Sequence, residues 1–146
     1  MSDFKKLKVW QDARELTVAT IRASDDMSGS TATIVRGQLV RAVMSVPANI
    51  AEGSAKRSDR EFARFVRIAM GSATECENHM IIAHDLALFR DDDFDTLTSR
   101  IEEVRKMLTG LEKRLTSDAN KKTMRTAFSV LLIAGCGLLA SVAGVW

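Results

Sequence analysis

The chain has 146 residues, with 21 Lys and Arg against 19 Asp and Glu, so its formal net charge is only +2. This length predicts one domain of ordinary size, and the charge excludes a highly cationic nucleic-acid coat and an acidic tail. A single proline, eight glycines and no tyrosine argue against a β-sandwich or barrel, which needs frequent turns and aromatic strands. The composition predicts an all-α protein.

The first amphipathic helix is expected from about residue 4 to residue 23, with Leu7, Trp10 and Leu16 on its apolar half. The turn-rich stretch SDDMSGST, at 24–31, follows it. A second helix is expected from about residue 33 to residue 52, ending at Gly53. Pro47 lies inside this helix, where it cannot donate to the carbonyl of Val43 and should kink the axis.

The second helix carries one polar stripe at steps of 3, 4, 4 and 3, formed by Gln38, Arg41, Ser45, Asn49 and Glu52. A solvated helix face is one interpretation of this stripe. The other is a hydrogen-bonded seam against another helix or subunit, because amides and a hydroxyl are mixed with only one Arg and one Glu, whereas the other polar faces favour Lys, Arg, Asp and Glu.

A third helix is predicted to begin with a capping box, Ser58 and Glu61, and to continue to about residue 89. Five basic residues gather at its start: Lys56, Arg57, Arg60, Arg64 and Arg67. They predict either contact with nucleic acid or another anionic surface, or a solvated face that Asp59 and Glu61 partly neutralise. No aromatic residue is expected on the basic face, so contact with nucleic acid would be to its backbone.

A fourth helix is predicted after the acidic turn at 91–93. Its apolar residues follow an unbroken heptad pattern: Phe94, Leu97, Ile101, Val104, Leu108, Leu111 and Leu115. This spacing is typical of knobs-into-holes packing in a bundle. The four segments together predict an antiparallel four-helix bundle over residues 1–115.

A basic linker is predicted at 116–126, before residues 127–146, which carry no charge. Twenty helical residues span about 30 Å, so this tail is interpreted as an additional C-terminal transmembrane helix. Its basic flank predicts a single-pass inner-membrane protein with the bundle in the cytoplasm. The alternative is a buried C-terminal helix in a cytoplasmic protein.

Residues with catalytic or metal-binding chemistry are few and scattered. His79 follows Glu75 and Cys76 on one helix, but no carboxylates from other helices accompany them. Cys76 and Cys136 are 60 positions apart, with no motif for a disulfide framework or zinc site. We therefore expect no enzyme activity, no cofactor and no metal.

The segment S-V-P-A-N-I-A-E-G at 45–53, the opening block F-K-K-L-K-V-W-Q-D-A and the run E-F-A-R-F at 61–65 carry a resemblance. They resemble the bacterial four-helix-bundle family of 23S rRNA intervening-sequence proteins, which is related to accessory variability proteins of diversity-generating retroelements. The resemblance covers roughly residues 4–115 and implies a homo-oligomer, a pentamer, without enzyme activity. It also implies that the polar stripe is the seam.

Two functions follow from these observations. The first is a non-catalytic oligomeric scaffold, tethered to the membrane by 127–146, that mediates protein–protein interaction. The alternative is a nucleic-acid-binding accessory protein, associated with rRNA or a reverse transcriptase, that uses the basic face.

Overall fold

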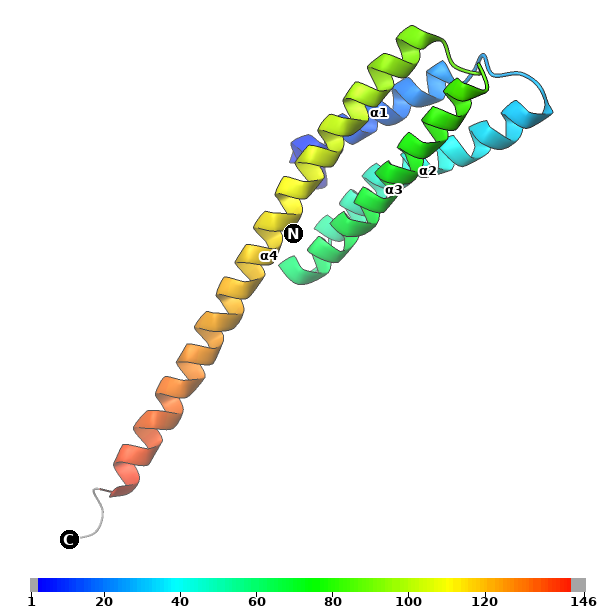
Figure 1. Cartoon of the computed structure of the whole chain (residues 1–146). Coiled ribbons are helices and arrows are strands. Elements are labelled where there is room, and N and C mark those ends of the chain that lie inside the picture. The colour runs from blue at the N-terminus through cyan, green and yellow to red at the C-terminus, as the bar shows by residue number, and fades with distance from the viewer. Residues whose placement is uncertain (1–2, 143–146) are drawn as a thin grey trace.

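The computed structural model describes residues 3–142, and the side chains of residues 3–126. A short 3-10 helix, η1 (Phe4–Lys6), precedes four α-helices: α1 (Lys8–Ala23), α2 (Ser30–Ser54), α3 (Asp59–Asp85) and α4 (Asp91–Val142). No strand occurs between residues 3 and 142, so the all-α prediction is confirmed. The helices run alternately up and down, and α4 extends far beyond the others (Figure 1).

The four helices occupy the corners of a square in chain order. In the described part of the chain α1 contacts α2 and α4, whereas α3 contacts α2 and α4. The backbones of the diagonal pairs, α1 with α3 and α2 with α4, do not approach each other closely over these residues. The side formed by α2 and α3 (the α2–α3 edge) is therefore opposite the side formed by α1 and α4 (the α1–α4 edge).

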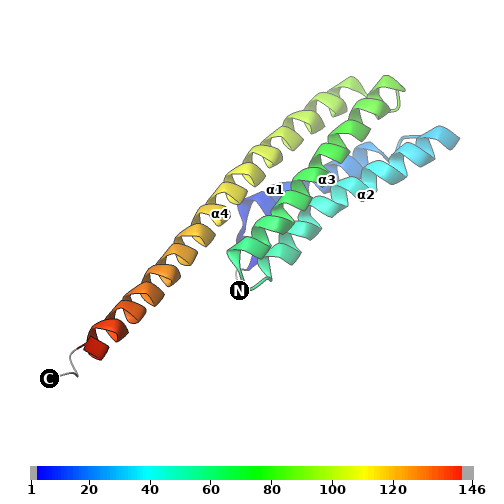
Figure 2. The same cartoon turned by 60° about the horizontal axis from the view of Figure 1, so that its bottom comes forward.

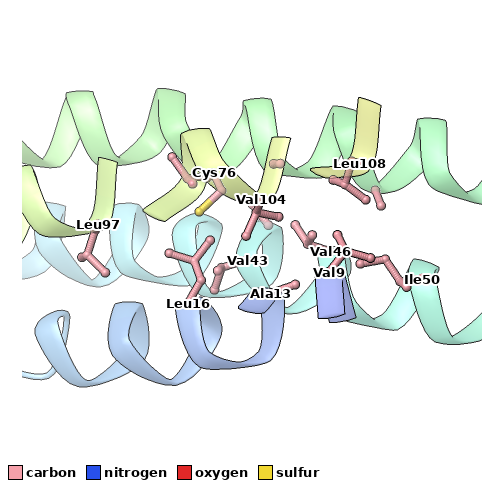
Figure 3. Close-up of a cluster of buried hydrophobic side chains, with 14 of the residues drawn as sticks. Val9, Ala13, Leu16, Val43, Val46, Ile50, Cys76, Leu97, Val104 and Leu108 are labelled. Atoms are coloured by element: carbon pink, nitrogen blue, oxygen red, sulfur yellow. The ribbon is translucent and has the colours of Figure 1, made fainter. Parts of the chain in front are cut away.

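Aliphatic side chains from all four helices meet along the bundle axis (Figure 3). Leu16, Val43 and Val104 are at most 1 % exposed. The heptad prediction for α4 is confirmed, because six of its seven positions are buried and Phe94 packs against the core. Burial of such side chains is the main favourable term in folding.

Ion pairs along α3 and α4 define their antiparallel register. Lys122 Nζ lies 2.5 Å from Asp59 Oδ2, and Arg67 pairs with Glu112 at 2.9 Å. These pairs are exposed and contribute little stability each. They place the predicted linker, 116–126, in α4 alongside the start of α3 (Figure 2).

The N-terminus of α3 confirms the predicted capping box: the Ser58 hydroxyl accepts from the Glu61 amide at 3.2 Å and donates to the Glu61 carboxylate at 2.8 Å. The helix ends at Asp85, about four residues before the predicted end. Ala87 has φ of 54°, and the amide of Leu88 donates to Ala83 O at 2.8 Å. This left-handed residue closes the helix without a glycine, which is why the sequence did not reveal the stop.

The predicted inner-membrane, single-pass localisation needs correction. Residues 127–146 lie outside the described side chains, and only the backbone of 127–142 is described, as the last part of α4. A membrane-spanning helix needs about 20 consecutive, mostly apolar residues. Among the residues that the structure describes, no helix is both long enough and apolar enough to cross a membrane. The inner-membrane localisation and the additional transmembrane helix are therefore not supported.

Candidate interaction surfaces

Two members of the polar stripe lie at the junction of α2 and α3. The Ser45 hydroxyl is 2.8 Å from the hydroxyl of Ser72 on α3. Asn49 Nδ2 donates to Ser45 Oγ at 3.0 Å and to Ser45 O at 2.8 Å. Sequence reasoning missed Ser72, because its position on an otherwise apolar stripe of α3 gives no signal of a partner 27 residues away.

The other three members lie further from this junction. Gln38 is half-buried and accepts a hydrogen bond from Arg41, which is exposed. Glu52 is also exposed, and its carboxylate lies 3.1 Å from the Nζ of Lys56. Within one chain, therefore, Ser45 bonds to α3 and Asn49 supports it from its own helix, whereas Arg41 and Glu52 are outward charges available to a partner.

The carbonyl of Val43 lacks its usual helical hydrogen bond, because Pro47 has no N–H, but it has another partner. Thr17 on α1 places its hydroxyl 3.1 Å from Val43 O and 2.8 Å from Ala13 O in its own helix. An unsatisfied buried carbonyl costs about 1–3 kcal/mol. Thr17 therefore offsets part of the cost of a proline inside α2 and links α1 to α2 at that level.

Gly53 lets α2 and α3 approach closely next to their turn. A Cβ at this position would lie 2.6 Å from Phe62 Cδ2 and 2.7 Å from Phe65 Cβ. The predicted stop at Gly53 was wrong, since α2 continues through Ser54. The glycine serves helix packing, not helix termination.

Apolar side chains are exposed on the outer face of the α2–α3 edge. Ile34 is 69 % exposed and Met44 53 % on α2. On α3, Ile68, Ile82 and Leu86 are 39–48 % exposed. Between Arg36 and Lys56 the only charged residues of α2 are Arg41 and Glu52. This face, with apolar groups and few charges, has the composition of a protein-binding surface.

The basic residues predicted from sequence lie at the end of the bundle where α2 turns into α3. Arg57, Arg60, Arg64 and Arg67 are exposed there, and Lys56 is half-buried. The expectation that no aromatic residue accompanies them was wrong. Phe65 lies under two of these cations, 4.6 Å from Lys56 Nζ and 5.6 Å from the guanidinium of Arg64.

The fold adds cations from two other segments to this end. The N-terminal segment contributes Lys5 and Lys6 from η1 and Lys8 from the start of α1, and α4 contributes Lys113, Arg114, Lys121, Lys122 and Arg125. We define the basic end as residues 3–12, 52–67 and 112–125. It holds 13 of the 21 basic side chains and seven of the 19 acidic ones. The rest of the bundle has a net negative charge. One end of the long axis is therefore positive and the remainder of the bundle is negative.

The groups considered for catalysis are not gathered into a site. Burial is the main cause that raises the pKa of the Cys76 thiol to about 12, so it stays protonated at neutral pH. His79 lies 3.7 Å from Glu75 on the same helix. Over the described residues, no three His, Cys, Asp or Glu side chains are arranged to hold a metal ion. Cys136 lies outside the described side chains.

The protein is therefore an up-down-up-down four-helix bundle with two distinct surfaces, one apolar and one basic. The model of the 23S rRNA-intervening sequence protein family matches residues 5–110, and the chain belongs to this family. The match includes the polar stripe and the five predicted basic residues.

Among solved structures, the chain is similar to a protein with unknown function from the S23 ribosomal protein family of Bacteroides thetaiotaomicron. The two are 20 % identical with a TM-score of 0.67, over 72 % of this chain and 98 % of the other. At this identity the similarity supports the fold alone. A comparison with curated proteins gives no match.

Proposed function

We propose that this protein is a non-catalytic scaffold that works as a homo-oligomer, and that the outer face of the α2–α3 edge is its self-association surface. The observation that carries the proposal is the exposure of Ile34 and Met44 on a helix whose only charged residues after Arg36 are Arg41 and Glu52. Arg41 and Glu52 have opposite signs, so a surface on another copy that carries the reverse order of charges can pair with both. A five-fold ring is the assembly that the family resemblance implies.

Sedimentation of the full chain over a range of concentrations tests this proposal. We expect the wild type to sediment as an oligomer and Met44→Glu to shift it towards the monomer, because the charge would be buried in the contact. Ile81→Glu is the matched control. Ile81 is 45 % exposed and lies one turn after Glu77, which pairs with Arg105 on α4, so it faces away from the α2–α3 edge. A monomeric wild type at all concentrations would refute self-association.

A second candidate function is binding of nucleic acid through the basic end. The observation that favours it is the convergence of Lys and Arg from three separate segments, with α4 alongside α3. Phosphates attract such a surface without base-specific contacts, and each neutralised phosphate gives a log–log salt slope of roughly −0.9 on duplex DNA.

Binding of a fluorescent duplex at several salt concentrations tests the second candidate. Replacing Arg57, Arg60 and Arg64 together by Ala should reduce the slope by up to about three units if all three contact phosphate. The matched control replaces Arg14, Arg22 and Arg90, which lie outside the basic end, and should leave the slope unchanged. Absence of binding by the wild type at low salt would eliminate this function.

A further inference from the structure

Three depressions follow one another along the α1–α4 edge. Their volumes are about 370, 210 and 520 Å³. The first lies between the start of α1 and the stretch of α4 from Met107 to Arg114. The second is lined by Asp12, Glu15, Glu103 and neighbouring residues, and the third continues towards Arg22. The bundle therefore carries a discontinuous groove on the side opposite the apolar face of α2 and α3.

On α4 the residues that line this groove share one helical face. Arg100, Glu103, Met107, Gly110 and Arg114 are spaced by 3, 4, 3 and 4. A Cβ at Gly110 would have nothing within 4 Å, so the groove is open at that level. Arg114 takes part in none of the ion pairs formed among the described residues, and Glu103 makes only a 3.9 Å contact with Lys106. Both charges are available to a partner.

The outward stripe of α2 has a matching spacing with the opposite signs. Arg41 and Glu52 are 11 residues apart, as are Glu103 and Arg114 on α4. Eleven residues make about three helical turns and about 16.5 Å, so each pair of charges lies on one side of its helix. In both helices a small residue lies four positions before the second charge: Ala48 on α2 and Gly110 on α4.

The direction of the helices allows these two stripes to meet in register. Because the helices alternate in direction, α2 and α4 run the same way (Figure 1). Copies related by rotation about an axis parallel to the bundle therefore bring α2 of one copy parallel to α4 of the next. In a single register Arg41 then faces Glu103 of the neighbouring copy, and Glu52 faces its Arg114. Ala48 approaches the neighbour's Gly110, where no side chain obstructs contact.

We propose that α2 of one copy docks into the α1–α4 groove of a second copy, held by the Arg41–Glu103 and Glu52–Arg114 pairs. This inference rests on the proposed self-association and names the surface that receives the apolar face. Because the two surfaces differ and lie on opposite edges, the contact is heterologous, which generates a ring when the rotation closes. Within one chain, Glu52 forms an exposed ion pair with Lys56. Such a pair contributes little to stability, so Glu52 can exchange it for a pair with Arg114 of the neighbour at little cost.

Charge reversal across the contact tests the proposed register. Sedimentation of the full chain would compare wild type, Arg41→Glu, Glu103→Arg and the double variant. Each single variant places like charges opposite each other, so we expect the dissociation constant to rise about tenfold or more. The double variant restores the opposite signs and should return association to within about threefold of wild type. Glu52→Arg and Arg114→Glu repeat the experiment at the second pair.

Matched controls use the neighbouring residues of α4 with the same charge changes. Glu102→Arg and Lys113→Glu are exposed but lie one position away from the stripe, and they should leave association unchanged. Thermal melting of each variant verifies that the bundle folds. If the wild type associates but the single reversals act no more strongly than the controls, or the double variant is no better than the singles, the register is wrong while self-association survives. A monomeric wild type would overturn the proposed function itself.

Discussion

The α2–α3 edge is closely packed, whereas the α1–α4 edge of the same bundle is open. At Gly53 the side chains of α3 leave no room for even a methyl group on α2, but at Gly110 of α4 nothing lies within 4 Å of that position. The close edge has small and polar residues where its helices meet, such as Ser45, Ser72 and Gly53. At the open edge, long charged side chains flank the depressions.

This difference gives the two edges different shapes. Small residues let two helices approach closely, so little space is left between α2 and α3 near Gly53. Helices that are kept further apart leave a groove between them. A bundle with an exposed apolar helix face on one side and a groove on the opposite side has two different surfaces for repeated association with copies of itself.

The largest expected effect comes from closing the small gap at Gly53. Gly53→Ala should destabilise the bundle by about 1–3 kcal/mol, because Phe65 Cβ is fixed to the backbone and α3 has to move. This loss exceeds the gain of up to about 1 kcal/mol in helix propensity. Denaturant unfolding would measure it. Gly71→Ala is the control, since a Cβ there meets nothing within 4 Å and should stabilise. Equal stabilisation by both substitutions would contradict the close approach.

A smaller effect is expected where α1 is linked to α2. Thr17→Val removes the hydroxyl near Val43 O and should cost about 1–2 kcal/mol. In a Pro47→Ala background the new amide can donate to the same carbonyl, so the cost of Thr17→Val should fall. A double-mutant cycle measured by denaturant unfolding gives this coupling. Strictly additive free energies would mean that Thr17 does not compensate for the proline.

The smallest effect concerns a hydroxyl on α1 itself. Thr20 is fully buried, and its Oγ1 has no hydrogen-bond partner among the described residues. Thr20→Val keeps the shape and removes the unpaired group, so it should stabilise the bundle by about 1 kcal/mol. Thermal melting would detect an increase of several degrees for a domain of this size. A lower melting temperature would indicate that the hydroxyl has an unrecognised partner.

The sequence by itself determined the class of fold and its core. The heptads of α4 have the period of a buried helix face, and the capping box of α3 has a fixed local spacing, so both could be predicted. The family was also evident from the segment at 45–53, within the residues that the family model matches. The predicted helix ends were less accurate. The end of α3 depends on the left-handed conformation of Ala87, which no glycine or other sequence signal near this residue predicts.

Only the tertiary structure decided which distant residues meet. Ser72 is the partner of Ser45, Thr17 lies beside the carbonyl that Pro47 leaves free, and Gly53 fits against Phe62. Each of these contacts joins two helices, and periodicity along one helix does not specify the rotation and depth at which another helix packs against it. The basic end is similar: local charge runs predicted residues 56–67, but the addition of α4 depends on the antiparallel register of α3 and α4. Packing between helices, not the pattern within any one of them, places these groups together.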